Sequence, residues 1–233
     1  MNYFITIVLC FNCFYCATSF DTYFGACSLI NHGKTFSDSE IQSIIQKKIL
    51  KLNKEFNPTA SKKSFLFIID NGKEKIYHQH WDWSLGITYH KPEKIIVKDP
   101  AMAHISKMKF EKIIEHELNH LMVNRVKLQQ TIPRWFKEGF AMYYSNEISF
   151  NHKLKIGQNI YNRELFNLDN LKQFKNKNQS DFNFAYAQSA IYATSIQNLY
   201  GQNALKRIFN NLQKGESFEQ SFYNATSTSI DNF

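Results

Sequence analysis

The most informative segment of the sequence is "FEKIIEHELNHLMVNRV", residues 110–126. Its apolar residues recur every three or four positions, which predicts a single amphipathic helix with one side facing a core. Within that apolar side the sequence places His116, Glu117 and His120. Two imidazoles and a carboxylate in a buried stripe would lose their hydrogen bonds to water, so each of them needs a partner there.

The spacing of these three residues favours a metal site. Helix positions four apart differ by about 40° around the axis, so His116 and His120 can present ring nitrogens to one point. Glu117 flanks that point without occupying it. Two neutral imidazoles and a nearby carboxylate are what a catalytic zinc site requires. On this motif alone, two hydrogen-bonded histidines in a core remain the competing interpretation.

A third ligand for such a metal is available in "IPRWFKEGFAMYY", residues 132–144. A proline precedes a second predicted helix, which carries Glu138. The neighbouring Gly139 would let two helix backbones approach closely. Val126, six residues after His120, cannot bind a metal, so Glu138 is the candidate third ligand.

Taken together, "HELNH" (116–120) and "PRWFKEGFA" (133–141) resemble the gluzincin metallopeptidases. The resemblance is closest to the peptidase MA-like proteins, relatives of thermolysin and of the zinc aminopeptidases. It continues at "AYAQSAIYATSIQNLYG" (185–201) and at "WSLGITYHKPEKIIVKDP" (83–100), and it covers roughly residues 60–233.

This resemblance implies a zinc metallopeptidase with one Zn²⁺ per chain. His116, His120 and Glu138 would bind the zinc, and Glu117 would act as general base toward an activated water. Tyr186, in "AYAQS", would donate a hydrogen bond to the developing oxyanion.

Tyr186 also has a structural interpretation, an aromatic side chain packed between helices, and Tyr192 is the alternative donor. A peptide or protein substrate is expected to add to the exposed edge of a small sheet, at residues 83–89. Three histidines lie near that strand as further metal-ligand candidates, with scattered surface histidines as the competing interpretation: His78, His80 and His90.

The remaining patterns predict an α+β fold, in which a small mixed sheet packs on a mainly helical domain that carries the motif helix. Helices are expected at residues 37–56, 110–126, 134–145, 168–174, 181–200, 203–213 and 217–226. Strands are expected at 64–70, 74–80, 83–90 and 93–99. Asn71-Gly72 favours a hairpin between the first two strands, and Lys91-Pro92 joins the last two.

The first 19 residues are expected to be a signal peptide, because no charged side chain precedes Asp21 and the middle is apolar. Cleavage is expected after Ser19, which predicts a secreted or periplasmic, cell-envelope protein without a stable membrane span. A buried N-terminal helix or strand is the competing interpretation, and Cys16 is a conceivable lipid-attachment site. Only Cys27 would remain, so no internal disulfide is expected.

The chain is therefore expected to contain three parts: a signal-like segment (1–19), a helical extension (20–59) and a gluzincin-like domain (60–233). The chain has 233 residues and 43% hydrophobic residues, enough for one domain with a real core. Its net charge of +8 comes from lysines spread along the chain, which argues against a nucleic-acid surface.

Two other functions compete with the peptidase. The same zinc and base would serve a hydrolase of another amide, in a cell wall or a small molecule. A zinc-stabilised cell-surface binding module without turnover is the second, although a purely structural zinc needs no Glu117.

Overall fold

The described part of the chain forms a five-stranded sheet with helices packed on it and beside it. The computed structural model describes residues 17–59, 62–74, 76, 82, 84–126, 132–148, 165–172, 174 and 178–233. The strands are β1 (Thr18–Thr22), β2 (Gly25–Asn31), β3 (Phe65–Asp70), β4 (Gly86–His90) and β5 (Glu93–Lys98). The helices are α1 (Asp38–Phe56), α2 (Pro100–Ala103), α3 (Lys107–Asn124), α4 (Arg134–Tyr144), α6 (Leu168–Leu171), α7 (Gln179–Tyr200), α8 (Ala204–Lys214), α9 (Phe218–Thr226) and the 3₁₀ turn η1 (Ile230–Asn232). The α+β class predicted from the sequence is confirmed.

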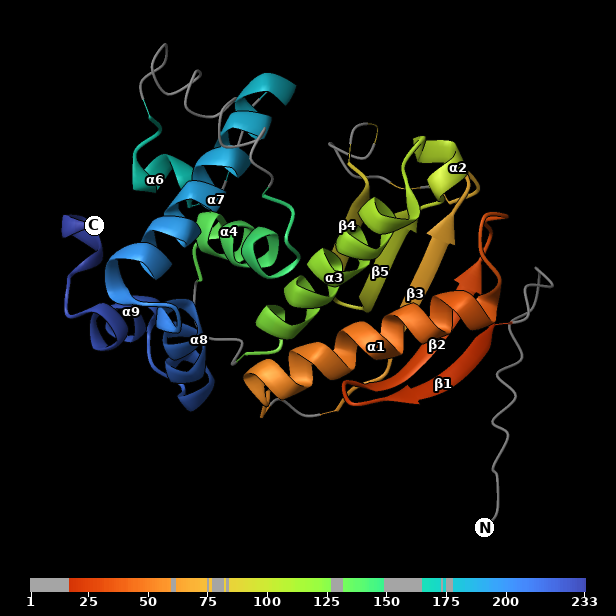
Figure 1. Cartoon of the computed structure of the whole chain (residues 1–233), viewed down its shortest axis with the longest axis horizontal. Helices are drawn as coiled ribbons and strands as arrows, with labels where there is room; N and C mark the ends of the chain where they lie inside the picture. The colour runs from red at the N-terminus through yellow and green to blue at the C-terminus, as the bar shows by residue number, and fades with distance from the viewer. Residues whose placement is uncertain are drawn as a thin grey trace.

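Figure 1 shows two layers in the sheet-containing half of the molecule. Helices α1 and α3 run side by side across one face of the sheet, and α4 and α6–α9 form a helical group beside it. The motif helix α3 touches both parts, since it contacts β4 and β5 on one side and α4 on another. This position puts α3 at the junction between the sheet and the helical group.

The sheet is mixed, as predicted, with the strand order β1-β2-β3-β5-β4. Strand β3 pairs in parallel with β2 and with β5, whereas the β1–β2 and β4–β5 pairs are antiparallel. The parallel step from β2 to β3 is made through α1, the helical crossover that a parallel connection requires. Strand β4 lies at one edge of the sheet, so one of its sides carries no strand partner among the described residues.

The predicted hairpin at Asn71-Gly72 is wrong. Both sides of β3 are already paired, with β2 and β5, so residues 74–80 cannot be its partner. The turn after β3 is instead held by Asp70, whose Oδ1 accepts from the backbone N–H groups of Gly72, Lys73 and Glu74 at 2.9–3.0 Å. Most of residues 74–80, with His78 and His80, lie outside the described part of the chain.

The expected helical extension at residues 20–59 also needs correction. Before α1, this segment forms the antiparallel pair β1 and β2, and β2 pairs with β3 across the expected domain boundary. Cys27 and Leu29 are fully buried in β2, so the segment contributes to the common core. Only these two residues of β2 alternate as buried apolar side chains, and two are too few for the alternation to predict a strand.

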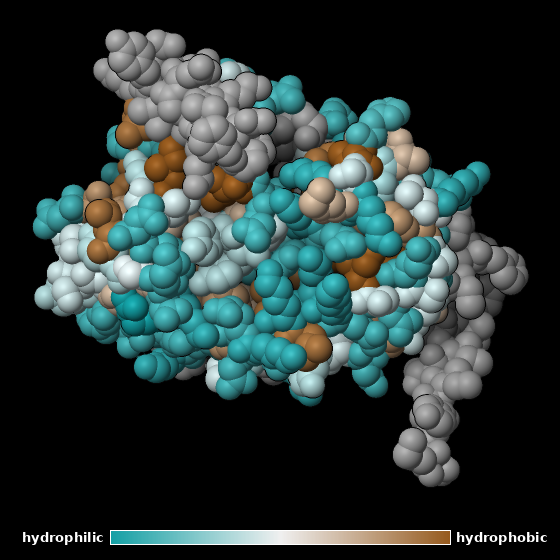
Figure 2. All heavy atoms as spheres, viewed as in Figure 1, coloured by the Kyte–Doolittle hydropathy of each residue, from teal (hydrophilic) through white to brown (hydrophobic). Residues whose placement is uncertain are grey.

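Helix α1 begins as the sequence predicts. Ser37 and Glu40 form a reciprocal capping box, in which the Glu40 carboxylate accepts from the Ser37 backbone N–H at 2.9 Å. One side of the helix is buried, through Ile41, Ile45 and Ile49 among others. The opposite side contributes to the mostly hydrophilic face seen in Figure 2.

The helical group is organised around α4 and α7. Gly139 of α4 faces the backbone of α7 so closely that an added Cβ would collide with the carbonyl oxygen of Ser189. Trp135, also on α4, is fully buried and packs against Phe218 at a ring-centroid distance of 5.8 Å. The close α4–α7 contact fixes α4, and therefore Glu138, relative to the rest of the molecule.

The expected signal segment lies almost entirely outside the described residues, and β1 begins within it at Thr18. Among the described helices, none is both long enough and apolar enough to cross a membrane.

Candidate metal centre

The centre is built on the buried side of α3. Ser106 caps this helix by accepting from the Lys109 backbone N–H, and the helix then runs between β4 and α4. His116 and Glu117 expose only 8% and 5% of their surface. Since polar groups at such positions need partners, the neighbouring elements must supply them.

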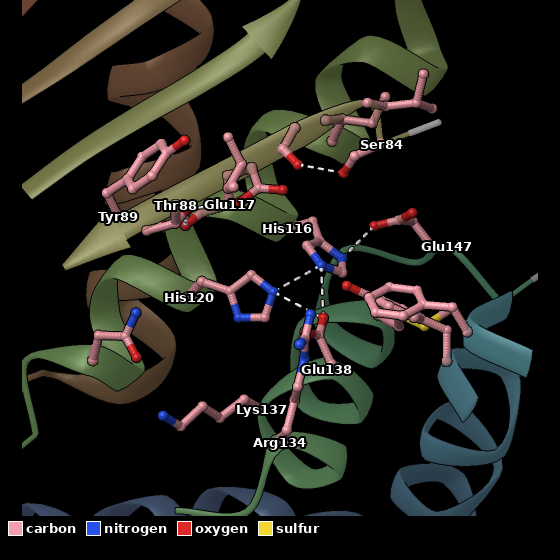
Figure 3. Close-up of a pocket in the computed structure, with 18 of the residues that line it drawn as sticks. Ser84, Thr88, Tyr89, His116, Glu117, His120, Arg134, Lys137, Glu138 and Glu147 are labelled. Atoms are coloured by element: carbon pink, nitrogen blue, oxygen red, sulfur yellow. Dashed lines mark hydrogen bonds and ion pairs between the residues drawn. The ribbon is translucent and has the colours of Figure 1, made fainter. Parts of the chain in front are cut away.

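Three side chains from two helices meet at one point. Nε2 of His120 lies 3.0 Å from Nε2 of His116 and 3.1 Å from Oε2 of Glu138, as Figure 3 shows. The His116 Nε2 atom is 3.6 Å from the same carboxylate oxygen. The structure therefore brings together the three residues that the sequence nominated as ligands, and in the described chain they form a group able to hold a metal ion.

The chemistry of this group fits a divalent cation. Nδ1 of His116 lies 2.7 Å from Oε1 of Glu147, and the opposite nitrogen of the ring, Nε2, faces the cluster. Burial disfavours charge on His116, yet Glu147 and Glu138 raise its pKa well above the usual value. The cluster thus favours a positive charge at its centre, and two imidazole nitrogens with one carboxylate oxygen are a donor set that zinc accepts.

Glu138 is held as a carboxylate. Burial alone would raise its pKa, but the charge of His120 and the close approach of both imidazoles keep the pKa well below its usual range. Its second oxygen, Oε1, accepts from Nε of Arg134 at 3.2 Å. One oxygen therefore remains directed at the histidines while the other is fixed by Arg134.

Glu117 is turned toward β4 rather than toward the three donor atoms. Its Oε2 accepts a hydrogen bond from Oγ1 of Thr88 at 2.7 Å. The backbone of β4 passes so close that a Cβ at Gly86 would lie 2.7 Å from Oε1 of Glu117. Burial raises the pKa of Glu117. A buried carboxyl group beside the donor cluster, with a raised pKa, is suited to accept and release a proton.

Tyr186 lies in the same cavity, and Tyr192 does not line it. The Tyr186 hydroxyl interacts with Arg134, and burial, followed by the charge of Glu138, raises its pKa. Its ring packs on Phe182 at 4.9 Å between centroids. By contrast, Tyr192 packs on Trp135 within the helical group. Tyr186 therefore has both an aromatic packing role and a hydroxyl near the site.

A cavity of about 680 Å³ is lined by the three ligand candidates and by Glu117 and Tyr186. It is bounded by β4, α3, α4 and α7, which supply main chain as well as side chains. Its size falls within the range of small-molecule and peptide sites. The lining comprises Ser84, Leu85, Gly86, Ile87, Thr88, Tyr89, Ile113, His116, Glu117, His120, Asn124, Ile132, Arg134, Lys137, Glu138, Met142, Glu147, Lys172, Phe182, Asn183 and Tyr186.

Three further residues support the site and are not singled out by the sequence motifs: Thr88, Arg134 and Glu147. Thr88 occupies an alternating position on a predicted strand, and Arg134 precedes Glu138 by one helical turn, so spacing offered a clue for both. Glu147 follows the end of α4, where no periodicity applies. His90 lies at the end of β4 outside the three-residue cluster.

Comparison with known proteins agrees with this architecture. A family model described as the Peptidase MA superfamily matches residues 44–232. Among solved structures, an aminopeptidase N family protein from Idiomarina loihiensis is similar in fold, with a TM-score of 0.54 and 16% sequence identity. The alignment covers 94% of this chain and 43% of that one, so this chain spans less than half the length of its structural neighbour. No curated protein matches the chain.

Proposed function

The chain belongs to the Peptidase MA superfamily, and from this premise we propose that it hydrolyses peptide bonds with the help of one zinc ion. The observation that carries the proposal is the convergence of His116, His120 and Glu138 beside Glu117 in one cavity. Family membership gives the class of peptidase-type hydrolases. The metal and the roles of the residues are our inference from the site.

His116, His120 and Glu138 would hold the zinc. When bound there, the ion supplies a Lewis acid that acidifies water and polarises a carbonyl group. Glu147 and Arg134 would keep two of these ligands in position through the contacts at His116 Nδ1 and Glu138 Oε1.

Glu117 would manage the protons of the reaction. Its carboxylate accepts a proton from the attacking water while the water oxygen bonds to the scissile carbonyl carbon. It then gives this proton to the departing nitrogen as the carbon–nitrogen bond breaks. The hydrogen bond from Thr88 fixes Oε2, and Oε1 would be the oxygen that exchanges the proton.

Tyr186 would stabilise the oxygen that becomes negative during attack. Its hydroxyl is a donor that lines the cavity and interacts with Arg134, which strengthens donation by placing positive charge nearby. Arg134 itself stacks over Phe182, with its guanidinium carbon 5.0 Å from the ring centroid.

Strand β4 would bind the backbone of the substrate. It lies at the edge of the sheet and lines the cavity from Gly86 to Tyr89. An extended peptide added to this edge would form main-chain hydrogen bonds and pass directly beside Glu117. Because such bonds ignore side-chain identity, they favour a peptide over a small amide without a backbone.

The test is a peptide-library digest with three preparations, each analysed for metal. The wild type is expected to carry about one zinc per chain and to cleave peptides. Glu117→Gln is expected to keep the zinc and lose turnover by about 10²–10⁴-fold. His116→Ala is expected to lose the zinc. Retention of full metal content by His116→Ala would refute the assigned site.

We also propose that the chain is exported by its first 19 residues, the last two of which begin β1. N-terminal sequencing of protein recovered outside the cytoplasm is expected to start at Phe20. Recovery only as the uncleaved chain would contradict this proposal.

A further inference from the structure

The charged side chains that line the cavity are nearly all engaged with one another. Glu147 contacts His116 and also accepts from Nζ of Lys109 at 3.0 Å. The carboxylates of Glu138 and Glu117 have the partners described above. A substrate entering the cavity therefore meets few charges that are still available for pairing.

Two of the three cations in the lining are also engaged. Arg134 pairs with Glu138, and Lys172 pairs with Asp169 at 2.6 Å. Lys137 is the third, and within the described part of the chain no carboxylate lies at ion-pair distance from its ammonium group. A lysine in this state, half-buried at the wall of a cavity, is incompletely compensated.

Lys137 immediately precedes Glu138 on α4, yet its side chain runs in another direction. Figure 3 shows it extending away from Arg134 on the side of His120 opposite to Glu147. Successive helix positions differ by about 100° around the axis, which explains why one residue supports the donor cluster and the next runs away from it while still lining the cavity.

Lys137 lines the same cavity as the far end of β4. Burial lowers the pKa of His90, the last residue of β4, and the charge of Lys137 contributes in the same direction. Tyr89, one residue earlier, lines the cavity as well. Gly86 stands beside Glu117 and precedes Tyr89 by three residues, or about 10 Å of strand. In a peptide bound along β4, a side chain two or three residues from the cleaved bond would thus lie near Lys137.

We propose that Lys137 selects substrates that carry a carboxylate two or three residues from the scissile bond on the Tyr89 side of the cavity. The inference rests on the proposed peptidase function and names its substrate class. The carboxylate belongs either to an acidic side chain or to the C-terminus of the peptide, since an ammonium group pairs with both in the same way. Because the cavity is partly desolvated, the ion pair with Lys137 would favour an anionic over a neutral peptide more strongly than an exposed ion pair would.

The experiment uses matched peptides on the full-length protein. Each pair differs only by Asp versus Asn at one position around the cleaved bond, or by a free versus an amidated C-terminus. The values of kcat/KM are measured for wild type, Lys137→Met, Lys137→Glu and the control Lys47→Met, which removes the same charge from the exposed side of α1. Affinities of the same peptides for the Glu117→Gln protein, with and without Lys137→Met, are measured by fluorescence anisotropy.

The wild type is expected to prefer one anionic peptide over its neutral partner by about tenfold. Lys137→Met should reduce this ratio to about twofold or less, Lys137→Glu should reverse it, and Lys47→Met should retain it. Equal losses on both members of a pair, or a ratio that survives Lys137→Met, would overturn the proposal. If no peptide is cleaved, the peptidase function fails, and the ratio of binding affinities still decides the role of Lys137.

Discussion

Oε1 of Glu147 lies 2.7 Å from Nδ1 of His116 and fixes the ring whose other nitrogen faces His120 and Glu138. Glu147 is itself anchored, because it accepts from Oγ of Ser145 at 2.8 Å. The charge of His116 and its hydrogen bond overcome the effect of burial and lower the pKa of Glu147, so it remains a carboxylate. The donor atoms of the cluster are thus oriented by a residue that never faces the metal position.

Removing this carboxylate should weaken metal binding. Glu147→Ala is expected to reduce zinc affinity by about 10–100-fold, because the His116 ring loses the acceptor that sets its orientation and tautomer. Glu147→Gln retains an oxygen acceptor and should recover part of the loss. Titration with a chromogenic chelator measures both variants, with Glu219→Ala, on the exposed side of α9, as the control. An affinity for Glu147→Ala within twofold of wild type would contradict the orienting role.

The two tyrosines of α7 should respond differently to loss of the hydroxyl. Tyr186→Phe is expected to lower kcat by about 10²-fold with unchanged zinc content, because a donor near the developing oxyanion is lost. Tyr192→Phe removes the acceptor for Nε2 of Gln188, 2.8 Å away, and should affect stability rather than kcat. Steady-state kinetics and metal analysis of both variants provide the test. An unchanged kcat in Tyr186→Phe would assign that residue to packing alone.

Helix α4 should not tolerate a side chain at Gly139. In Gly139→Ala the new methyl group meets the Ser189 carbonyl of α7, so the helices must separate, at a cost of about 1–3 kcal/mol. Because Glu138 moves with α4, zinc affinity should fall along with the melting temperature. Circular dichroism and chelator titration measure these effects. Ser43→Ala, on the exposed side of α1, is the matched control, and equal melting temperatures for the two variants would refute the steric argument.

Cys27 should be chemically silent in the native protein. Burial raises the pKa of its thiol to about 12, so at pH 8 the reactive thiolate is nearly absent. Iodoacetamide at pH 8 is expected to leave Cys27 unmodified in the folded chain. In denaturant, where the pKa returns to about 8.5, modification should proceed. Peptide mapping follows this residue separately from the cysteines near the N-terminus, and native labelling of Cys27 would show that β2 opens.

Much of the helical part of the fold follows from local sequence. The capping box at Ser37 and Glu40 and the apolar periodicity after it predict α1 closely, because a helix is stabilised within its own segment. The pairing of the strands, by contrast, does not follow from local sequence. Asn71-Gly72 is a good local hairpin sequence, yet β3 pairs with two distant strands, since sheet partners are chosen by burial across the whole chain.

Local spacing alone identifies the candidate residues at the metal centre. His116 and His120 share a helix face because of their spacing, and Glu138 was the available partner. The positions of Glu147 and Thr88 around them, in contrast, follow from the packing of distant segments. These contacts join separate elements of the chain, and their geometry depends on how β4, α4 and α7 pack around α3, which no local periodicity encodes.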